Sequence, residues 1–355
     1  MNPRIDIYVD RIKHNTRLLV EKAKTCNINL AVVTKSFCAM SEIVETLIDT
    51  EIKYLADSRI ENLKKMQHFK LEKMLLRLPM ISQVNEIVQF ADISLNSEIV
   101  TIRELNKAAI EQKRTHKIII MQDVGDLREG IFNDEEMISV VREASELSNI
   151  KVVGVGTNLS CFGGVIPDKE NLGELVETAK KVESILGYPL EIISGGNSSS
   201  LYLIDEFKMP KKINNLRIGE GIVLGGETTC GLQIEGAYID TFVLTAEIIE
   251  IKQKPSVPIG KIGLDAFGNV PSFKEKGNLI RAILAVGKQD FGAYDIFPID
   301  TEIKVLGSSS DHLIIDITSC EEPYKIGDEI SFTLGYGSLL ALMTSEYIYK
   351  NIVCE

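Results

Sequence analysis

The sequence of 355 residues contains no tryptophan, four histidines and six cysteines, and it lacks several patterns that mark particular classes of protein. The histidines are spread along the chain without metal-ligand spacing, so we predict no metal site. The cysteines form no C-x-x-C pair, which favours free thiols over disulfides. The phosphate-binding pattern G-x-x-x-x-G-K-[ST] is missing too, which argues against phosphoryl transfer through that loop.

Long apolar runs and an excess of positive charge are also missing. No stretch approaches the roughly 18 apolar residues of a membrane span, and residues 1–6 contain no apolar core of a signal peptide. The 51 acidic residues outnumber the 39 Lys and Arg, which gives a formal net charge of −12. Such a chain has no electrostatic footprint for nucleic acid or anionic lipid. We therefore expect a cytoplasmic protein that binds neither nucleic acid nor membranes.

Short β-rich runs alternate with amphipathic helical stripes over the first two thirds of the chain. The stripes are clearest at 101–115, 135–150 and 172–187, where apolar residues recur at steps of three and four. Eight strand–helix units over this length predict a (β/α)8 TIM-type barrel, with a doubly wound open sheet as the alternative. The eight candidate strands are 30–35, 54–58, 74–78, 93–96, 117–124, 151–158, 191–197 and 216–224.

The pattern changes after Gly225. Alternating apolar residues appear at 242–248, and Gly and Pro separate the short β runs that follow. Only 339–349 has a helical pattern again. The sequence thus predicts an α/β barrel domain over 8–230 and a smaller all-β domain over 235–355, with residues 1–7 as a further candidate member of the second. The later β runs are 279–286, 303–306, 313–318 and 330–334.

Three predicted strand ends carry unusual chemistry, at the end of the barrel where enzymes of this fold have their active sites. Lys35 closes the first strand, where desolvation can lower the pKa of a lysine and favour Schiff-base formation. The turn at 194–200 (SGGNSSS) offers small residues and hydroxyls to an anion. The eighth strand adds Arg217, Gly219 and Glu220. Each feature alone also fits an ordinary surface lysine, a flexible turn or a structural ion pair, but together they are what pyridoxal 5'-phosphate requires.

At these residues the chain resembles the alanine racemase family, the fold-type III pyridoxal-phosphate enzymes, and within it the ornithine racemase branch. The resemblance covers nearly the whole chain. It implies an isomerase, a pyridoxal-phosphate-dependent amino acid racemase that interconverts L- and D-ornithine through two acid/base groups, and by family analogy a homodimer. The matching stretches are AVVTKSFCA (31–39), LADSRIENLKK (55–65), GDLREG (125–130), SGGNSSS (194–200), LRIGEGIVLGGET (216–227), IGLDAFGN (262–269) and LAVGKQD (284–290).

The resemblance also implies roles for individual residues. Lys35 matches the lysine that holds the cofactor and serves as one acid/base group. Arg217 matches the arginine that hydrogen-bonds the pyridine nitrogen; fold-type III decarboxylases have a carboxylate there, so Arg217 favours racemisation. Arg128 matches the arginine near the substrate carboxylate. The residues that match the phosphate-binding turns are Ser194, Gly196, Asn197, Ser198, Gly219 and Glu220, the last two through backbone amides.

Three positions depart from the family pattern. Asn158 stands where the family has a histidine behind the cofactor ring, and Cys38-Ala39 stands where alanine racemases have a tyrosine. The stretch 263–268 lacks the tyrosine that acts as the second base from the partner subunit.

Asp265 is the nearest ionisable group in that stretch. We consider it as the second catalytic group or as a ligand for a cationic side chain, with Tyr336 and Tyr347 as alternative bases. Ornithine carries a second ammonium group, so Asp290 and Asp295 are further candidates for substrate binding, together with Tyr336.

Four alternatives stay open. The chain could racemise lysine, alanine or serine instead of ornithine. It could be a pyridoxal-phosphate homeostasis protein, since such single-barrel proteins share the ADSRIENL stretch but lack a β domain. A fold-type III decarboxylase and a barrel enzyme that acts on sugar phosphates without pyridoxal are the remaining two.

Overall fold

The computed structural model describes residues 1–292 and 295–354. It divides into two compact units. The barrel unit comprises Arg11–Tyr238, and the sheet unit comprises Met1–Asp10 together with Ile239–Glu355.

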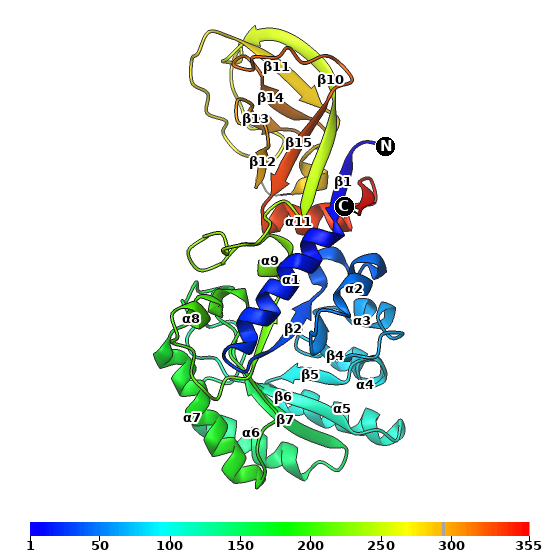
Figure 1. Cartoon of the computed structure of the whole chain (residues 1–355), viewed down its shortest axis with the longest axis vertical. Helices are drawn as coiled ribbons and strands as arrows, with labels where there is room; N and C mark the ends of the chain where they lie inside the picture. The colour runs from blue at the N-terminus through cyan, green and yellow to red at the C-terminus, as the bar shows by residue number, and fades with distance from the viewer. Residues whose placement is uncertain (293–294, 355) are drawn as a thin grey trace. The chain divides into compact units, whose positions relative to one another are not determined.

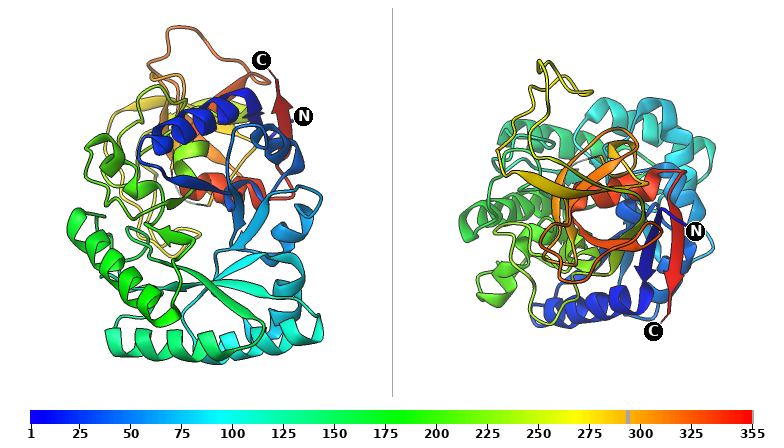
Figure 2. Two further views of the ribbon diagram at one scale, coloured as in Figure 1. Left: turned by 60° about the horizontal axis from the view of Figure 1, so that its bottom comes forward. Right: turned by 90° about the horizontal axis from the view of Figure 1, so that it is seen from above.

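The barrel unit contains a closed ring of eight strands, β2 to β9 in sequence order, and the registers between neighbours are parallel. This confirms the predicted (β/α)8 class (Figure 1, Figure 2). Several strands are buried along their whole length, because side chains on one face fill the ring and those on the other contact the helices. The strands are β2 (Asn29–Val33), β3 (Tyr54–Asp57), β4 (Glu72–Leu75), β5 (Ile93–Asn96), β6 (His116–Met121), β7 (Ile150–Gly156), β8 (Ile192–Ser194) and β9 (Asn215–Ile218).

Helices connect the strands, and Figure 1 shows α5, α6 and α7 on the outside of the ring. The clearest signals belong to α7, which begins with a capping box between Asp168 and Asn171 and ends at Gly187, whose φ is 75°. The helices are α1 (Val9–Lys24), α2 (Ser41–Leu47), α3 (Ile60–Lys65), α4 (Val84–Phe90), α5 (Ile99–Glu111), α6 (Asp134–Glu146), α7 (Lys169–Leu186), α8 (Tyr202–Asp205) and α9 (Glu220–Val223), with 3-10 turns η1 (Lys35–Phe37), η2 (Ile81–Gln83) and η3 (Ser198–Ser200).

The interior of the ring is a packed apolar core. Ala31, Ala56, Met74, Ile119 and Ile192, from different strands, belong to one buried cluster. Full burial of an aliphatic side chain stabilises a fold by about 1.5–3 kcal/mol, so this cluster is a major source of barrel stability. It also confines chemistry to the ends of the strands.

Seven of the eight predicted barrel strands end earlier in the structure than expected, among them the first and the eighth. The first was predicted to end at Lys35, but β2 ends at Val33 and the chain turns there, because Thr34 O accepts hydrogen bonds from Phe37 N and Ala39 N at 3.2 Å each. The eighth was predicted to run through 216–224, but β9 ends at Ile218 and α9 follows.

The sheet unit contains an eight-stranded sheet with the order β12-β15-β10-β11-β14-β13, and β1 pairs with both β10 and β16. The all-β domain after the barrel is therefore confirmed. The predicted helix at 339–349 is partly wrong, because α11 stops at Thr344 and the chain is extended again from Tyr349. The elements are β1 (Arg4–Tyr8), β10 (Phe242–Pro255), β11 (Asn278–Leu284), α10 (Lys288–Phe291), β12 (Ile296–Pro298), β13 (Lys304–Ser308), β14 (Leu313–Asp316), β15 (Glu329–Leu334), α11 (Tyr336–Thr344) and β16 (Tyr349–Val353).

Candidate active site

We use the word rim for the end of the barrel where its parallel strands finish. Lys35 lies on the rim as the first residue of η1, directly after β2, and its side chain is exposed. Strand β2 pairs with β9 on one side and with β3 on the other. Residues that follow β9 and β3 therefore flank Lys35.

Asp57, the last residue of β3, supports the segment that carries Lys35. Its buried carboxylate accepts hydrogen bonds from Thr34 Oγ1 at 2.6 Å, Asn62 Nδ2 at 3.1 Å and the backbone N–H of Arg59 at 2.8 Å. Burial raises the pKa of this carboxyl above its ordinary value, and the three donors offset only part of that rise. Thr34 is thus fixed immediately before Lys35.

The same network reaches the far side of Lys35. Lys65 Nζ donates to Asn62 Oδ1 at 3.2 Å and to Cys38 O at 2.9 Å. Cys38 has a φ of 54°, a conformation that residues other than glycine rarely adopt. We call Thr34, Asp57, Asn62, Lys65 and Cys38 the lysine clamp, because their hydrogen bonds hold the backbone on both sides of Lys35.

Arg217, on β9, is buried and has only neutral hydrogen-bond partners. Its Nη2 donates to Thr157 O at 2.6 Å, and its Nη1 donates to Ser194 Oγ. Burial lowers the pKa of the guanidinium to about 10. No carboxylate pairs with it in the described part of the chain, although buried charges usually have such a partner.

The predicted anion-binding turn follows β8. Asn197 holds it in place: its Nδ2 donates to Asn158 Oδ1 at 3.1 Å and to Leu159 O at 2.8 Å, while its Oδ1 accepts from Ser199 N. Gly196 has a φ of 107°, which strongly favours glycine. Ser198 Oγ accepts from Gly221 N at 3.1 Å, so the turn is joined to α9, which begins with Glu220 after Gly219.

Buried polar atoms without a hydrogen-bond partner gather near the rim. Most of the buried unpartnered atoms among the described residues come from side chains at or just beyond the ends of barrel strands. Buried polar groups normally have partners, so such a gathering favours a site that binds a polar ligand. Hydroxyl and amide donors among them suit the oxygens of a phosphate. The rim atoms are Ser36 Oγ, Asn96 Oδ1, Gln122 Oε1, Thr157 Oγ1, Asn158 Nδ2 and Ser199 Oγ.

Arg128 lies in the loop after β6, and both oxygens of Glu129 accept hydrogen bonds from its guanidinium. The charges of Glu129 and Arg128 affect the pKa of Arg217, which places this loop near Arg217. Asp126 fixes the loop to its neighbour after β7, since it accepts from the backbone N–H groups of Ser160 and Val165 at 3.1 Å each.

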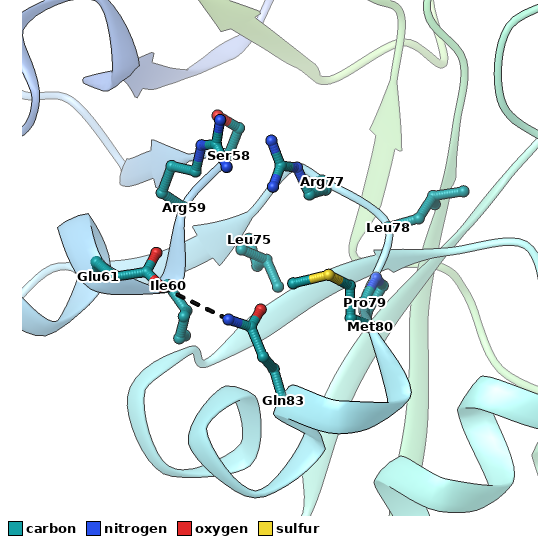
Figure 3. Close-up of a pocket in the computed structure, with 10 residues that line it drawn as sticks. All are labelled: Ser58, Arg59, Ile60, Glu61, Leu75, Arg77, Leu78, Pro79, Met80 and Gln83. Atoms are coloured by element: carbon teal, nitrogen blue, oxygen red, sulfur yellow. Dashed lines mark hydrogen bonds between the residues drawn. The ribbon is translucent and has the colours of Figure 1, made fainter. Parts of the chain in front are cut away.

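A pocket of about 170 Å³ lies beside the ends of β3 and β4 (Figure 3). Arg59 and Arg77 line it, and the figure shows their guanidinium groups at the same end. Glu61 and Gln83 line another part, joined by a hydrogen bond of 3.5 Å. Sequence reasoning missed Asp57, Arg59 and Arg77. Their place at or two residues beyond a strand end was the signal that could have identified them.

Asp265, Asp290 and Tyr336 belong to the sheet unit, so the rim contacts described above do not include them. Asp265 is an exposed turn residue whose carboxylate accepts from Asn269 N at 2.8 Å and Phe267 N at 2.9 Å. These backbone bonds, with a smaller contribution from Lys288, hold its pKa below the ordinary value.

The other two have different surroundings. Asp290 is buried and accepts from Ser345 Oγ at 3.1 Å and Gly287 N at 3.3 Å, and Tyr336 is the first residue of α11. Asp295, also considered for substrate binding, accepts from Gly337 N at 2.9 Å and Ser338 N at 3.0 Å at the start of α11.

Within 1–292 and 295–354, no group of three or more His, Cys, Asp or Glu side chains could hold a metal ion. In the same part of the chain, no helix combines the length and the apolar character needed to cross a membrane.

Comparison with known proteins gives the family. The model of the alanine racemase N-terminal domain matches residues 7–226. The chain is 46% identical to an ornithine racemase of Acetoanaerobium sticklandii over 353 residues, which cover 99% of this chain and 100% of that one. It is 40% identical to a lysine racemase of Thermotoga maritima, with 98% of each chain covered.

A solved structure has the same fold. The alanine racemase of Bartonella henselae with covalently bound pyridoxal phosphate matches with a TM-score of 0.76 at 15% identity, over 99% of this chain and 100% of that one. The chain therefore belongs to the alanine racemase family, and the resemblance inferred from the sequence motifs is confirmed.

Proposed function

We propose that this protein is a pyridoxal-phosphate-dependent amino acid racemase whose substrate is ornithine. One structural observation carries the proposal. Lys35 follows strand β2, and the buried Arg217 lies on the neighbouring strand β9, beside a turn rich in hydroxyl and amide donors. The substrate assignment is supported by full-length similarity to an ornithine racemase.

Pyridoxal phosphate, when bound, supplies an electron sink that makes the α-proton of an amino acid easier to remove. The chain offers a candidate group for each part of this cofactor. Lys35 Nζ would hold the aldehyde end, and Arg217 would donate a hydrogen bond to the ring nitrogen. Because Arg217 can only donate, that nitrogen would stay unprotonated, which would favour proton exchange over decarboxylation. Asn158 would pack behind the ring. The phosphate turns comprise Ser194, Gly196, Asn197, Ser198, Gly219 and Glu220.

Racemisation needs a proton-transfer group on each face of the α-carbon. Lys35 serves one face. Asp265 is our candidate for the other, since its hydrogen bonds favour the ionised form that can accept a proton. Tyr336 and Tyr347 are the alternatives.

Substrate and assembly complete the proposal. Asp265 and Asp290 are the candidates for the second ammonium group of ornithine, and Arg128 and Tyr336 are further substrate-binding candidates. We also propose a cytoplasmic homodimer in which the sheet unit of one copy completes the site of the other.

Replacement of Lys35 by alanine tests the central assignment. We expect racemisation of ornithine to fall by about a thousandfold or more, because both cofactor attachment and one proton-transfer group are lost. Lys70→Ala, at an exposed lysine on the same unit, is the control and should behave as wild type. Borohydride reduction followed by peptide mass spectrometry should place the cofactor on Lys35; cofactor on another lysine would refute the assignment.

Lysine is a second candidate substrate, because the chain is also 40% identical to a lysine racemase over its full length. Rates of α-proton exchange in heavy water with ornithine, lysine, alanine and serine separate the possibilities. A higher kcat/KM for ornithine than for lysine is the expected result.

A further inference from the structure

Arg128 and Glu129 form an ion pair in the loop between β6 and α6. Both carboxylate oxygens of Glu129 accept hydrogen bonds from the guanidinium group of Arg128. The side chain of Glu129 is only 14% exposed, whereas that of Arg128 is 40% exposed. Within residues 1–292 and 295–354, the carboxylate of Glu129 has no further hydrogen-bond or ion-pair partner. A mostly buried carboxylate thus depends on one side chain for a compensating charge.

The backbone of this loop places Glu129 at the rim. Ile131 N donates to Met121 O at 2.8 Å, and Asp123 N donates to Ile131 O at 3.1 Å, so the loop returns to the end of β6. Gly130 packs directly against that end, because a Cβ atom on it would lie 2.5 Å from Asp123 N. Glu129 immediately precedes Gly130 and is therefore held beside the end of β6.

Hydrogen bonds connect the same loop to the anion-binding turn after β8. Asp126 accepts from Cys161 N at 3.2 Å, and Asn197, in that turn, donates to Cys161 Sγ at 3.3 Å. The charge of Glu129 also acts on Arg217. Burial lowers the pKa of that guanidinium, and Glu129 offsets part of this effect. The ion pair therefore lies on the side of the rim that carries the residues proposed to hold the cofactor.

The other two carboxylates of the loop have partners that cannot turn away. Asp123 Oδ1 accepts from Gly125 N at 2.8 Å and Leu127 N at 3.1 Å. Asp126 accepts from four backbone N–H groups of the stretch 160–165. These donors belong to the backbone, whereas the donor to Glu129 is a flexible side chain. Glu129 is therefore the carboxylate of this loop that can exchange its partner for a ligand.

A substrate carboxylate at Arg128 competes with Glu129 for the same nitrogens. When Arg128 turns to the substrate, Glu129 loses its cation, and a buried carboxylate without a partner is costly. Ornithine carries a second ammonium group that can take the place of the guanidinium. We propose that Glu129 binds the side-chain ammonium of the substrate while Arg128 binds its α-carboxylate. This rests on the proposed racemase function, and it assigns the ammonium to the barrel unit instead of to Asp265 or Asp290.

Ornithine and norvaline test the proposal kinetically, because norvaline has the same carbon skeleton without the second amine. Glu129→Gln keeps the shape and removes the charge, so it should lower kcat/KM for ornithine about tenfold or more and should not lower that for norvaline. Glu129→Asp should keep part of the preference for ornithine. Glu146→Gln, at an exposed glutamate at the end of α6, is the matched control and should behave as wild type. Equal losses on both substrates in Glu129→Gln would overturn the proposal.

A binding measurement separates this proposal from the proposed function. Pentanoate with a dimethylamino group on its last carbon has a protonated amine that cannot form a Schiff base, and pentanoate with an isopropyl group there is its uncharged match. Ligand-observed NMR on the holoenzyme should show that wild type binds the amine about tenfold more tightly, and that Glu129→Gln loses this preference. If wild type does not racemise ornithine but shows this pattern, the ammonium site stands without the racemase. If wild type racemises ornithine and Glu129→Gln binds the two ligands as wild type does, the ammonium site is refuted and the racemase stands.

Discussion

Single residues of the barrel show how burial selects a protonation state. His116 is buried at the start of β6, and its Nε2 lies 2.8 Å from Ser94 Oγ. Burial lowers the pKa of the imidazole to about 4. The folded barrel therefore holds this histidine in its neutral form across the physiological pH range.

We predict an acid-dependent loss of stability that depends on His116. In the unfolded chain an imidazole binds a proton below about pH 6.5, whereas the folded chain does not until about pH 4. As the pH falls from about 6.5 to about 4, the unfolded state is increasingly favoured. The free energy of unfolding decreases by about 3 kcal/mol over this window. Urea unfolding of wild type and of His116→Gln, measured across this window, should show a steeper decline for wild type. Parallel curves would contradict the prediction.

The sequence identified those candidate site residues that can be recognised from their place at the end of a predicted strand. Lys35 and the 194–200 turn could be found because apolar strands precede them. Asp57 ends a strand, and Arg59 and Arg77 lie two residues beyond one, but their significance depends on their partners. Asp57 is buried among three donors, and within residues 1–292 and 295–354 neither arginine has an acidic partner. Partners come from segments distant in the sequence, so composition and periodicity do not reveal them.

Among the elements, the lysine clamp connects α3 to the segment between β2 and α2. Thr34 and Cys38, on the two sides of Lys35, are both tied to residues of the 57–65 stretch. This gives the LADSRIENLKK motif (55–65) a structural role: its residues hold the backbone around Lys35.

We predict that Asp57→Asn separates activity from stability. The asparagine keeps the shape, but it presents an N–H group to donors that need an acceptor, so the clamp loosens around Lys35. A displacement of about 1 Å can reduce a rate a hundredfold, and we expect kcat to fall at least tenfold. Loss of a buried negative charge offsets the lost hydrogen bonds, so the free energy of unfolding should change by less than about 1 kcal/mol. Unchanged kcat in a stable variant would show that the clamp does not position Lys35.

Element boundaries were harder to predict than element types. The barrel strands and the helices predicted at 101–115, 135–150 and 172–187 were assigned correctly in kind, whereas the 16-residue α1 was not singled out. The ends of β2 and β9 were missed, because the hydrogen bonds that turn the chain at Thr34 and Gly219 are made by backbone groups that any residue carries. The 3-10 turn that contains Lys35 has no side-chain signature for the same reason.

For the whole molecule, the proposed dimer makes a prediction of its own. If Lys35 and Asp265 act in one site but come from different copies, Lys35→Ala and Asp265→Ala proteins should each be inactive. Mixed after reversible dissociation, they should recover about a quarter of wild-type activity, because half of the dimers are mixed and each of these has one intact site. Absence of recovery in a mixture that forms mixed dimers would exclude this arrangement. An active Asp265→Ala protein would exclude Asp265 as the second base.

Strand β1 has a consequence for how the protein is made. It pairs with β10 and with β16, so the first and last strands of the chain lie side by side in one sheet. All eight strands of the ring lie between Asn29 and Ile218. During translation the ring can thus assemble while the last third of the polypeptide is still on the ribosome. The N-terminal strand, by contrast, must wait for its parallel neighbour until residues 349–353 have been synthesised.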